Sequence, residues 1–176
     1  MVSFPILRFT LDTSCVIAAA QDQGYRDEVD KLVDLAKAGR VELWLTSAFT
    51  YDQSTARDDR RRTNLQWLSD RPLIGSVPGP FRLDLSPLGG SDVFASDEMG
   101  EADEKIKAIL LPGEPLPAGS RMIHDVHHLT AHLMAGHDAF ITNDRDMLKP
   151  GKRELLRSQV GITVLDPAEA VARATE

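Results

Sequence analysis

The chain has 176 residues, of which 42% are hydrophobic and 27% are charged, a composition typical of a globular protein with one packed domain. Its one cysteine, Cys15, excludes an internal disulfide framework and a cysteine-based zinc site, and its net charge of -7 argues against binding nucleic acid through overall positive charge. No run reaches the ~18 uncharged apolar residues that span a membrane, and Arg8 and Asp12 interrupt the N-terminus before a signal-peptide core forms, so we expect a cytoplasmic protein.

The first part of the chain is expected to alternate between strands and helices. Alternating apolar and polar residues predict strands, and apolar residues at every third or fourth position predict helices. The expected strands are 7–11 and 41–45, and the expected helices are 15–20, 25–40 and about 47–70. The first strand runs directly into Asp12, so we expect this acid at the carboxyl end of a strand, where ligands gather in open α/β sheets.

Residues 71–120 have a different composition. More than half of the chain's prolines and glycines lie in this segment, which predicts mostly loop, with one helix over about 96–111. We interpret it as a loop-rich insertion into a single domain that spans residues 1–176. It is either a cover over the functional site or a long connection.

The last part of the chain returns to the alternating pattern. The expected strands are 139–142 and 162–165, and the expected helices are 122–136, 146–158 (with a break or a late start at Pro150) and 167–174. Strands that alternate with helices favour a parallel sheet between two helical layers. The sequence therefore predicts an α/β fold of three α/β/α layers around a central parallel sheet.

Four acids are expected to meet at one edge of this sheet. Asp12 follows the first strand, Asp52 lies early in the third helix, Asp125 lies in the first turn of the helix 122–136, and Asp144 follows the third strand. Carboxylates forced together repel each other, and a divalent cation such as Mg²⁺, which prefers oxygen ligands, relieves the repulsion. We therefore predict these four acids to be catalytic, although each one alone also fits a turn, a helix cap or a solvated helix face.

Such a pocket suits the cleavage of phosphodiester bonds. A divalent cation can bind a phosphate oxygen, lower the pKa of water and stabilise the leaving oxygen. We expect the substrate to be RNA. The overall negative charge does not exclude this, because bound cations reverse the local field where a phosphate would sit.

Three motifs follow one another in a fixed order. They are Leu11-Asp12-Thr13-Ser14, then Asp125 at the start of a helix, and then the segment 140–148, in which a threonine–asparagine–acid turn follows a strand. In this order they resemble the PIN-domain ribonucleases, which include the toxins of many bacterial toxin–antitoxin pairs. The resemblance follows the element order over nearly the whole chain, and it is strongest over residues 122–148.

The resemblance implies a central parallel sheet and RNA cleavage that depends on Mg²⁺ or Mn²⁺. It implies metal-site acids at Asp12, Asp125 and Asp144, an accessory metal-site acid at Asp146, and supporting polar groups at Ser14, Thr142 and Asn143. As partners it implies an RNA substrate, a cognate antitoxin and a second copy in a homodimer. The family usually has glutamate where this chain has Asp52, and the 71–120 segment is longer than in compact toxins.

Histidines and arginines near the acids allow further interpretations. His124, His128 and His132 recur every four residues beside Asp125, which fits a histidine–aspartate metal site, half-buried polar-edge histidines or substrate contacts. The basic residues are Arg57 and Arg61 with their neighbours on the third helix, and Arg145 after the third strand. They fit phosphate contacts at the rim of the pocket or solvated helix faces.

Taken together, the sequence predicts a metal-dependent endoribonuclease, with a toxin of a toxin–antitoxin pair as one form of it. One alternative is a non-catalytic PIN-like module that binds RNA or a protein. The other is a metal-dependent phosphohydrolase that acts on DNA or a small phosphate ester.

Overall fold

A computed structural model describes residues 6–54, 56–71, 74–82, 86, 90–94, 96–113 and 121–176. Within these residues, five strands form one parallel sheet in the order β3-β2-β1-β4-β5. The strands are β1 (Leu7–Leu11), β2 (Val41–Thr46), β3 (Gly75–Val77), β4 (Ala139–Ile141) and β5 (Val164–Leu165). Helices cover both faces, which confirms the predicted three-layer α/β/α fold with a central parallel sheet.

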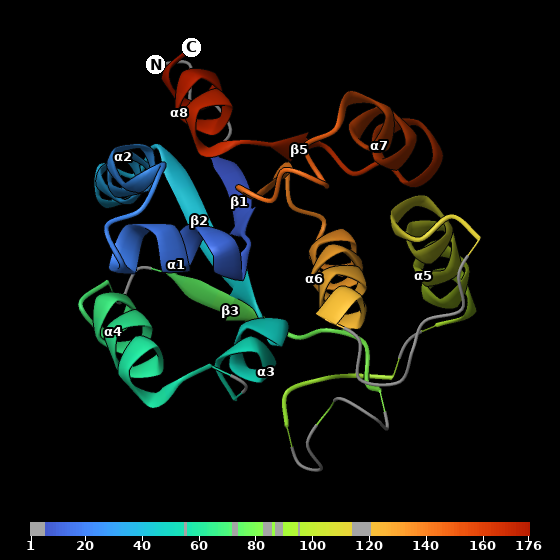
Figure 1. The fold of residues 1–176 in the computed structure, drawn as a ribbon. Coiled ribbons are helices and arrows are strands. Elements are labelled where there is room, and N and C mark those ends of the chain that lie inside the picture. Colours follow the sequence, from blue (N-terminus) through green and yellow to red (C-terminus); the bar gives the residue numbers. More distant parts are fainter. Residues whose placement is uncertain are drawn as a thin grey trace.

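The helices divide between the two faces of the sheet. One layer contains α1 (Thr13–Ala20), α2 (Arg26–Lys37), α4 (Asp58–Ser69) and α8 (Pro167–Thr175). The other layer contains α5 (Asp97–Leu110), α6 (Arg121–Ala135) and α7 (Pro150–Leu155). Helix α7 continues as a π-helix (Leu156–Val160). A short helix, α3 (Ala48–Ser54), follows β2 and packs against α6. Figure 1 shows α1 and α2 on one side of the strands and α5, α6 and α7 on the other.

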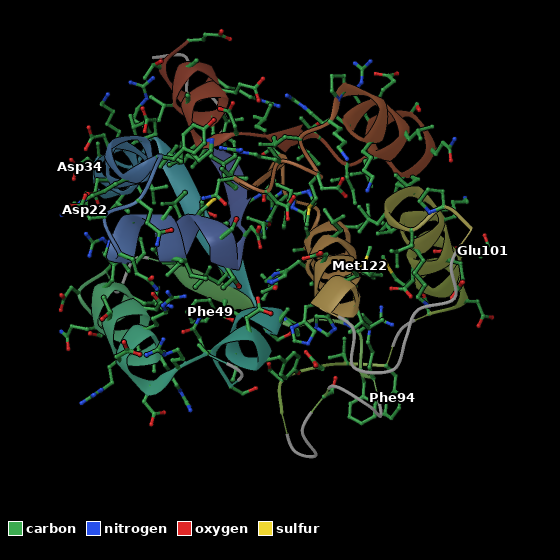
Figure 2. The ribbon with its side chains drawn as sticks, viewed as in Figure 1. Asp22, Asp34, Phe49, Phe94, Glu101 and Met122 are labelled. Carbon is green, nitrogen blue, oxygen red and sulfur yellow. The ribbon has the colours of Figure 1, made fainter. Side chains whose placement is uncertain are left out.

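Each layer encloses its own hydrophobic core because successive strand residues face opposite ways. Phe9 and Leu11 of β1 pack in one core with residues of α1 and α2, whereas Phe140 of β4 packs in the other core with α5 and α6. In Figure 2, Phe49 lies inside the molecule, while the side chains of charged residues such as Glu101 project from its outer surface. No helix of the described ranges is long and apolar enough to cross a membrane.

The strand order places a crevice at the middle of the sheet. The chain builds β1, β2 and β3 outward in one direction and then returns to add β4 and β5 on the other side of β1. The connections after β1 and β4 therefore leave the sheet in different directions. In open α/β sheets this reversal point, at the carboxyl ends of the strands, is where ligands bind.

The structure differs from the sequence prediction in three elements. The expected helix 47–70 is two helices, because Arg57 has an extended backbone (φ -63°, ψ 145°) and α4 starts only at Asp58. The segment predicted as loop contributes β3, which pairs in parallel with β2. Helix α6 starts at Arg121, so Asp125 lies in its second turn and not in its first.

Two further expectations concern the connections. The late start of the helix after β4 is confirmed, since α7 begins at Pro150, which is favourable in the first turn of a helix. Of the segment 71–120, the parts that lie outside the described residues are 72–73, 83–85, 87–89, 95 and 114–120.

Candidate functional site

A pocket of about 490 Å³ lies at the carboxyl edge of the sheet, beside the ends of β1 and β4. Its walls come from α1, α3, α4, α6 and the turn after β4. Asp12, Asp52, Asp125 and Asp144 all line it. The structure thus brings together the four acids that were predicted to meet, at the point where the strand order reverses.

Asp12 is held firmly at the base of this pocket. Its backbone N–H donates to the carbonyl oxygen of Ile141 at 2.8 Å, which ties the end of β1 to β4. Its Oδ2 accepts hydrogen bonds from the hydroxyls of Ser14 at 2.5 Å and Thr142 at 2.7 Å. These bonds use one carboxylate oxygen and orient the side chain. Oδ1 accepts no hydrogen bond from the residues that the structure describes and lies 3.8 Å from Nε2 of His128.

Asp144 is oriented by the turn in which it lies. Its Oδ1 accepts the backbone N–H groups of Asp146 at 2.6 Å and Met147 at 3.2 Å, and its own N–H donates to the Thr142 hydroxyl at 3.0 Å. The Asn143 side-chain amide donates to the carbonyl oxygen of Ser14 at 3.3 Å. Ser14, Thr142 and Asn143, predicted as supporting polar groups, therefore join the turn after β4 to the start of α1.

Asp125 differs from the other acids because its side chain forms no hydrogen bond and no ion pair with the described residues. It lines the pocket from α6. Burial raises its pKa to about 8, and the negative charges of Asp12, Asp144 and Asp52 add to the rise, while His128 opposes it. Near neutral pH the Asp125 carboxyl group therefore tends to keep its proton. A cation bound in the pocket would offset the repulsion between the carboxylates and so favour loss of this proton.

Asp52 is bound by two histidines of α6. Its Oδ1 lies 2.5 Å from Nδ1 of His124, and its Oδ2 lies 3.0 Å from Nε2 of His128. Burial would raise the pKa of this carboxyl, but the hydrogen bonds of the two histidines outweigh burial and hold the pKa well below its usual range. Asp52 thus lines the pocket as predicted, yet both of its oxygens are already bound by imidazole rings.

His128 binds Asp52 from a fully buried position. Although burial of the ring opposes protonation, the hydrogen bond to Asp52 and the charge of Asp12 raise its pKa. The other ring nitrogen, Nδ1, lies 2.6 Å from the hydroxyl of Thr46 at the end of β2. Sequence reasoning singled out the stripe of histidines, but its spacing alone could not show which acid faces it.

The stripe on α6 does not act as one unit. His124 and His128 reach Asp52, whereas His132 is buried and binds the Thr10 hydroxyl at 2.8 Å. Burial lowers the pKa of His132 to about 3, so this ring stays neutral. In the described part of the chain, no three histidine, cysteine, aspartate or glutamate side chains are placed to enclose one metal ion.

Four predicted side chains remain to be placed. Asp146 is exposed and forms ion pairs with Lys149 at 2.5 Å and with Lys152, outside the walls of the pocket. Arg57 lines the pocket, whereas Arg61 and Arg145 are exposed and do not. Arg60, which belongs to the same basic segment as Arg57 and Arg61, lines the pocket as well.

The free oxygens of the pocket suit a small divalent cation. Both oxygens of Asp125, Oδ1 of Asp12 and Oδ2 of Asp144 accept no hydrogen bond from described residues. Mg²⁺ usually keeps several waters and takes only one or two protein carboxylates, so it does not need three enclosing side chains. Asp125, together with Asp12 or Asp144, would hold Mg²⁺ or Mn²⁺ in this way.

No protein-family model matches the chain, and no curated protein matches it. What the pocket can do therefore rests on its own residues and their geometry.

Proposed function

We propose that this protein hydrolyses phosphodiester bonds of RNA at the pocket formed by Asp12, Asp125 and Asp144, with Mg²⁺ or Mn²⁺ as cofactor. The observation that carries the proposal is Asp125, a largely buried acid without a described partner whose pKa is raised by burial and by neighbouring carboxylates. Such an arrangement destabilises the fold and is typical of functional sites. The PIN-like motifs include all three acids, Asp12, Asp125 and Asp144, which supports the same reaction.

Each side chain has a distinct role in this proposal. A divalent cation, when bound, would bind a phosphate oxygen and stabilise the charge that develops on the leaving oxygen. Asp125 and one free oxygen each of Asp12 and Asp144 provide the negative charge that attracts this cation. Ser14 and Thr142 keep Asp12 in place by hydrogen bonds, so little reorganisation is needed when the cation and the substrate bind.

The PIN-domain resemblance extends the proposal further. It adds the role of a toxin in a toxin–antitoxin pair, a cognate antitoxin as partner and a homodimer. These three additions rest on the sequence motifs alone.

A metal-dependent cleavage assay tests the proposal. Single-stranded RNA is incubated with the protein and Mg²⁺ or Mn²⁺, and wild type is compared with Asp12→Asn, Asp125→Asn and the control Asp34→Asn, which changes an exposed acid of α2. We expect cleavage by wild type and the control, at least about a 100-fold loss in the two pocket variants, and no cleavage in EDTA. If wild type cleaves no faster than Asp125→Asn, the enzymatic proposal is wrong.

One observation favours a second candidate, a non-catalytic module that binds RNA. Asp52 is already bound by His124 and His128, so the ring of four acids is not complete as a set of free carboxylates. This candidate predicts that the wild-type protein retards single-stranded RNA in a gel without shortening it, in the presence of either cation.

A further inference from the structure

The pocket extends beyond its four acids, between two helices. Along α1 it is lined by Ser14 and Ile17 and then by Gln21 just after the helix, at a spacing of three and four residues that keeps them on one helix face. Seven residues correspond to about 10 Å of helix length. The facing wall repeats this spacing with Arg57, Arg60 and Asn64 at the start of α4. The two walls form a compartment next to the acids. The proposed cleavage chemistry gives no role to five of its lining residues, which are Ile17, Gln21, Arg57, Arg60 and Asn64.

Two residues that line this compartment, Gln21 and Asn64, belong to a chain of four side-chain amides. Nε2 of Gln23 donates to Oε1 of Gln21 at 3.4 Å, Nε2 of Gln21 donates to Oδ1 of Asn64 at 3.1 Å, and Nδ2 of Asn64 donates to Oε1 of Gln53 at 3.1 Å. Asn64 and Gln53 are buried. Because each bond orients the next amide, Gln21 and Asn64 are held in set positions at the wall of the pocket.

These amides retain unused hydrogen-bonding capacity. An amide nitrogen has two hydrogens and an amide oxygen has two lone pairs, so one bond at each atom leaves a second donor and a second acceptor. Gln21, which is half-buried and lines the pocket, can therefore present a donor and an acceptor side by side. That pair of groups matches the edge of a nucleobase, and glutamine and asparagine contact the N6 and N7 atoms of adenine in this way.

The other walls of the compartment suit the same ligand. Ile17 offers an apolar contact to a flat ring. Arg57 and Arg60 are exposed residues that line the wall, and a guanidinium plane can stack on an unpaired base. Nε of Arg57 lies 3.9 Å from Oδ1 of Asp59, whereas Arg60 forms no ion pair with any residue in the described ranges.

We propose that Gln21 and Asn64, with Ile17, Arg57 and Arg60, bind one unpaired nucleobase of single-stranded RNA, and that adenine is the preferred base. The inference rests on the proposed function, because the RNA strand would enter this compartment when its phosphodiester lies at the acids. It adds base selectivity to that function. A base must be unstacked to reach such a compartment, which selects single-stranded RNA over a duplex.

A binding experiment tests this base site separately from catalysis. The full chain carrying Asp12→Asn, which should not cleave, is titrated in EDTA against fluorescent oligoadenylate, oligocytidylate and oligouridylate, and anisotropy is measured. The same titrations are made after adding Gln21→Met, which removes the amide but keeps the length of the side chain. The control is Gln66→Met, which changes an exposed glutamine of α4 that does not line this pocket and binds Asp70. Circular dichroism melting checks that the variants are folded.

We expect oligoadenylate to bind most tightly, and Gln21→Met to weaken its binding at least about fivefold while the Gln66→Met control does not. Equal affinity for the three oligonucleotides, no detectable binding, or a base preference that Gln21→Met leaves unchanged would overturn the inference. A second variant, Asn64→Asp, keeps the shape and replaces the donor nitrogen by oxygen, and it should alter the same preference. If wild type cleaves RNA without any base preference, the proposed function stands and the base site fails. If it binds oligoadenylate selectively but cleaves no RNA, the base site stands and the proposed function fails.

Discussion

His128 and Asp52 form a buried pair in which Nε2 of the ring lies 3.0 Å from Oδ2 of the carboxylate. The ring is fully buried, and its Nδ1 is bound to the Thr46 hydroxyl, so a protonated ring uses both of its N–H groups. Both oxygens of Asp52 are thus bound by histidines of α6. Asp125, on the same helix, accepts no side-chain hydrogen bond and forms no ion pair among the described residues, and this difference indicates where an added cation would bind.

Removal of His128 should destabilise the fold because Asp52 would lose a charged partner in a largely buried position. We expect His128→Gln to lower the free energy of unfolding by about 3 kcal/mol, measured by urea denaturation at pH 7. The double variant with Asp52→Asn should recover part of this loss, since it also removes the uncompensated charge. A double variant no more stable than His128→Gln would show that the pair is not an ion pair.

Asp125 should be unfavourable for stability without metal. Its folded pKa of about 8 lies far above its ordinary value of 3.8, so the folded state holds a proton that the unfolded chain releases, and stability is lost as the pH rises from about 4 to 8. In EDTA at pH 8, Asp125→Asn should therefore be more stable than wild type by at least about 1 kcal/mol, measured by thermal melting.

Added cation should reverse this order. Binding to the folded state raises wild-type stability by mass action, by about 2.7 kcal/mol at a concentration 100 times the dissociation constant. Asp125→Asn should gain much less from Mn²⁺ than wild type does. Equal increases in the melting temperature of the two proteins would place the cation elsewhere.

The buried histidines His132 and His127 should make the protein sensitive to mild acid. Burial lowers their pKa values to about 3 and about 4, whereas the unfolded rings titrate near 6.5. Their contribution to stability is present above pH 6.5 and is lost as the pH falls from 6.5 toward those values. When the pH falls from 6.5 to 5, the free energy of unfolding should decrease in wild type by up to about 2 kcal/mol more than in His132→Gln. Parallel pH profiles for the two proteins would contradict this.

Two glycines in contrasting surroundings test the packing of the newly found strand. A Cβ added at Gly75 of β3 would lie 2.4 Å from the Trp44 ring, whereas a Cβ at Gly100 of α5 would meet no atom within 4 Å. We expect Gly75→Ala to lower the free energy of unfolding by about 1–3 kcal/mol and Gly100→Ala to raise it by about 0.4–1 kcal/mol, both measured by urea denaturation. If both changes have the same sign, β3 does not pack on Trp44 as described.

The periodicity of the sequence is sufficient for most elements and for the position of the four acids. Asp12, Asp52, Asp125 and Asp144 are predicted to converge because each lies near the carboxyl edge of a strand, and parallel pairing brings these ends to one edge. Strand β3 was missed because three residues in a segment rich in proline and glycine carry too little pattern to be recognised.

Side-chain partners were harder to predict than positions. Asp144 and Asp146 are two residues apart, yet one lines the pocket and the other forms ion pairs with Lys149 and Lys152 outside its walls. The division of the expected third helix also mattered, since the restart at Asp58 is what places Arg57, Arg60 and Asn64 along the pocket.

The sequence by itself therefore determined the α/β/α layers, the central parallel sheet and the edge at which the acids gather. Only the tertiary structure decided that His124 and His128 bind Asp52, that the Asp125 side chain has no hydrogen-bond or ion-pair partner among the described residues, and that Gln21 binds Asn64. The physical reason is that periodicity reports which face of an element is apolar. The partner of a charged or polar side chain depends on which other element packs against that face.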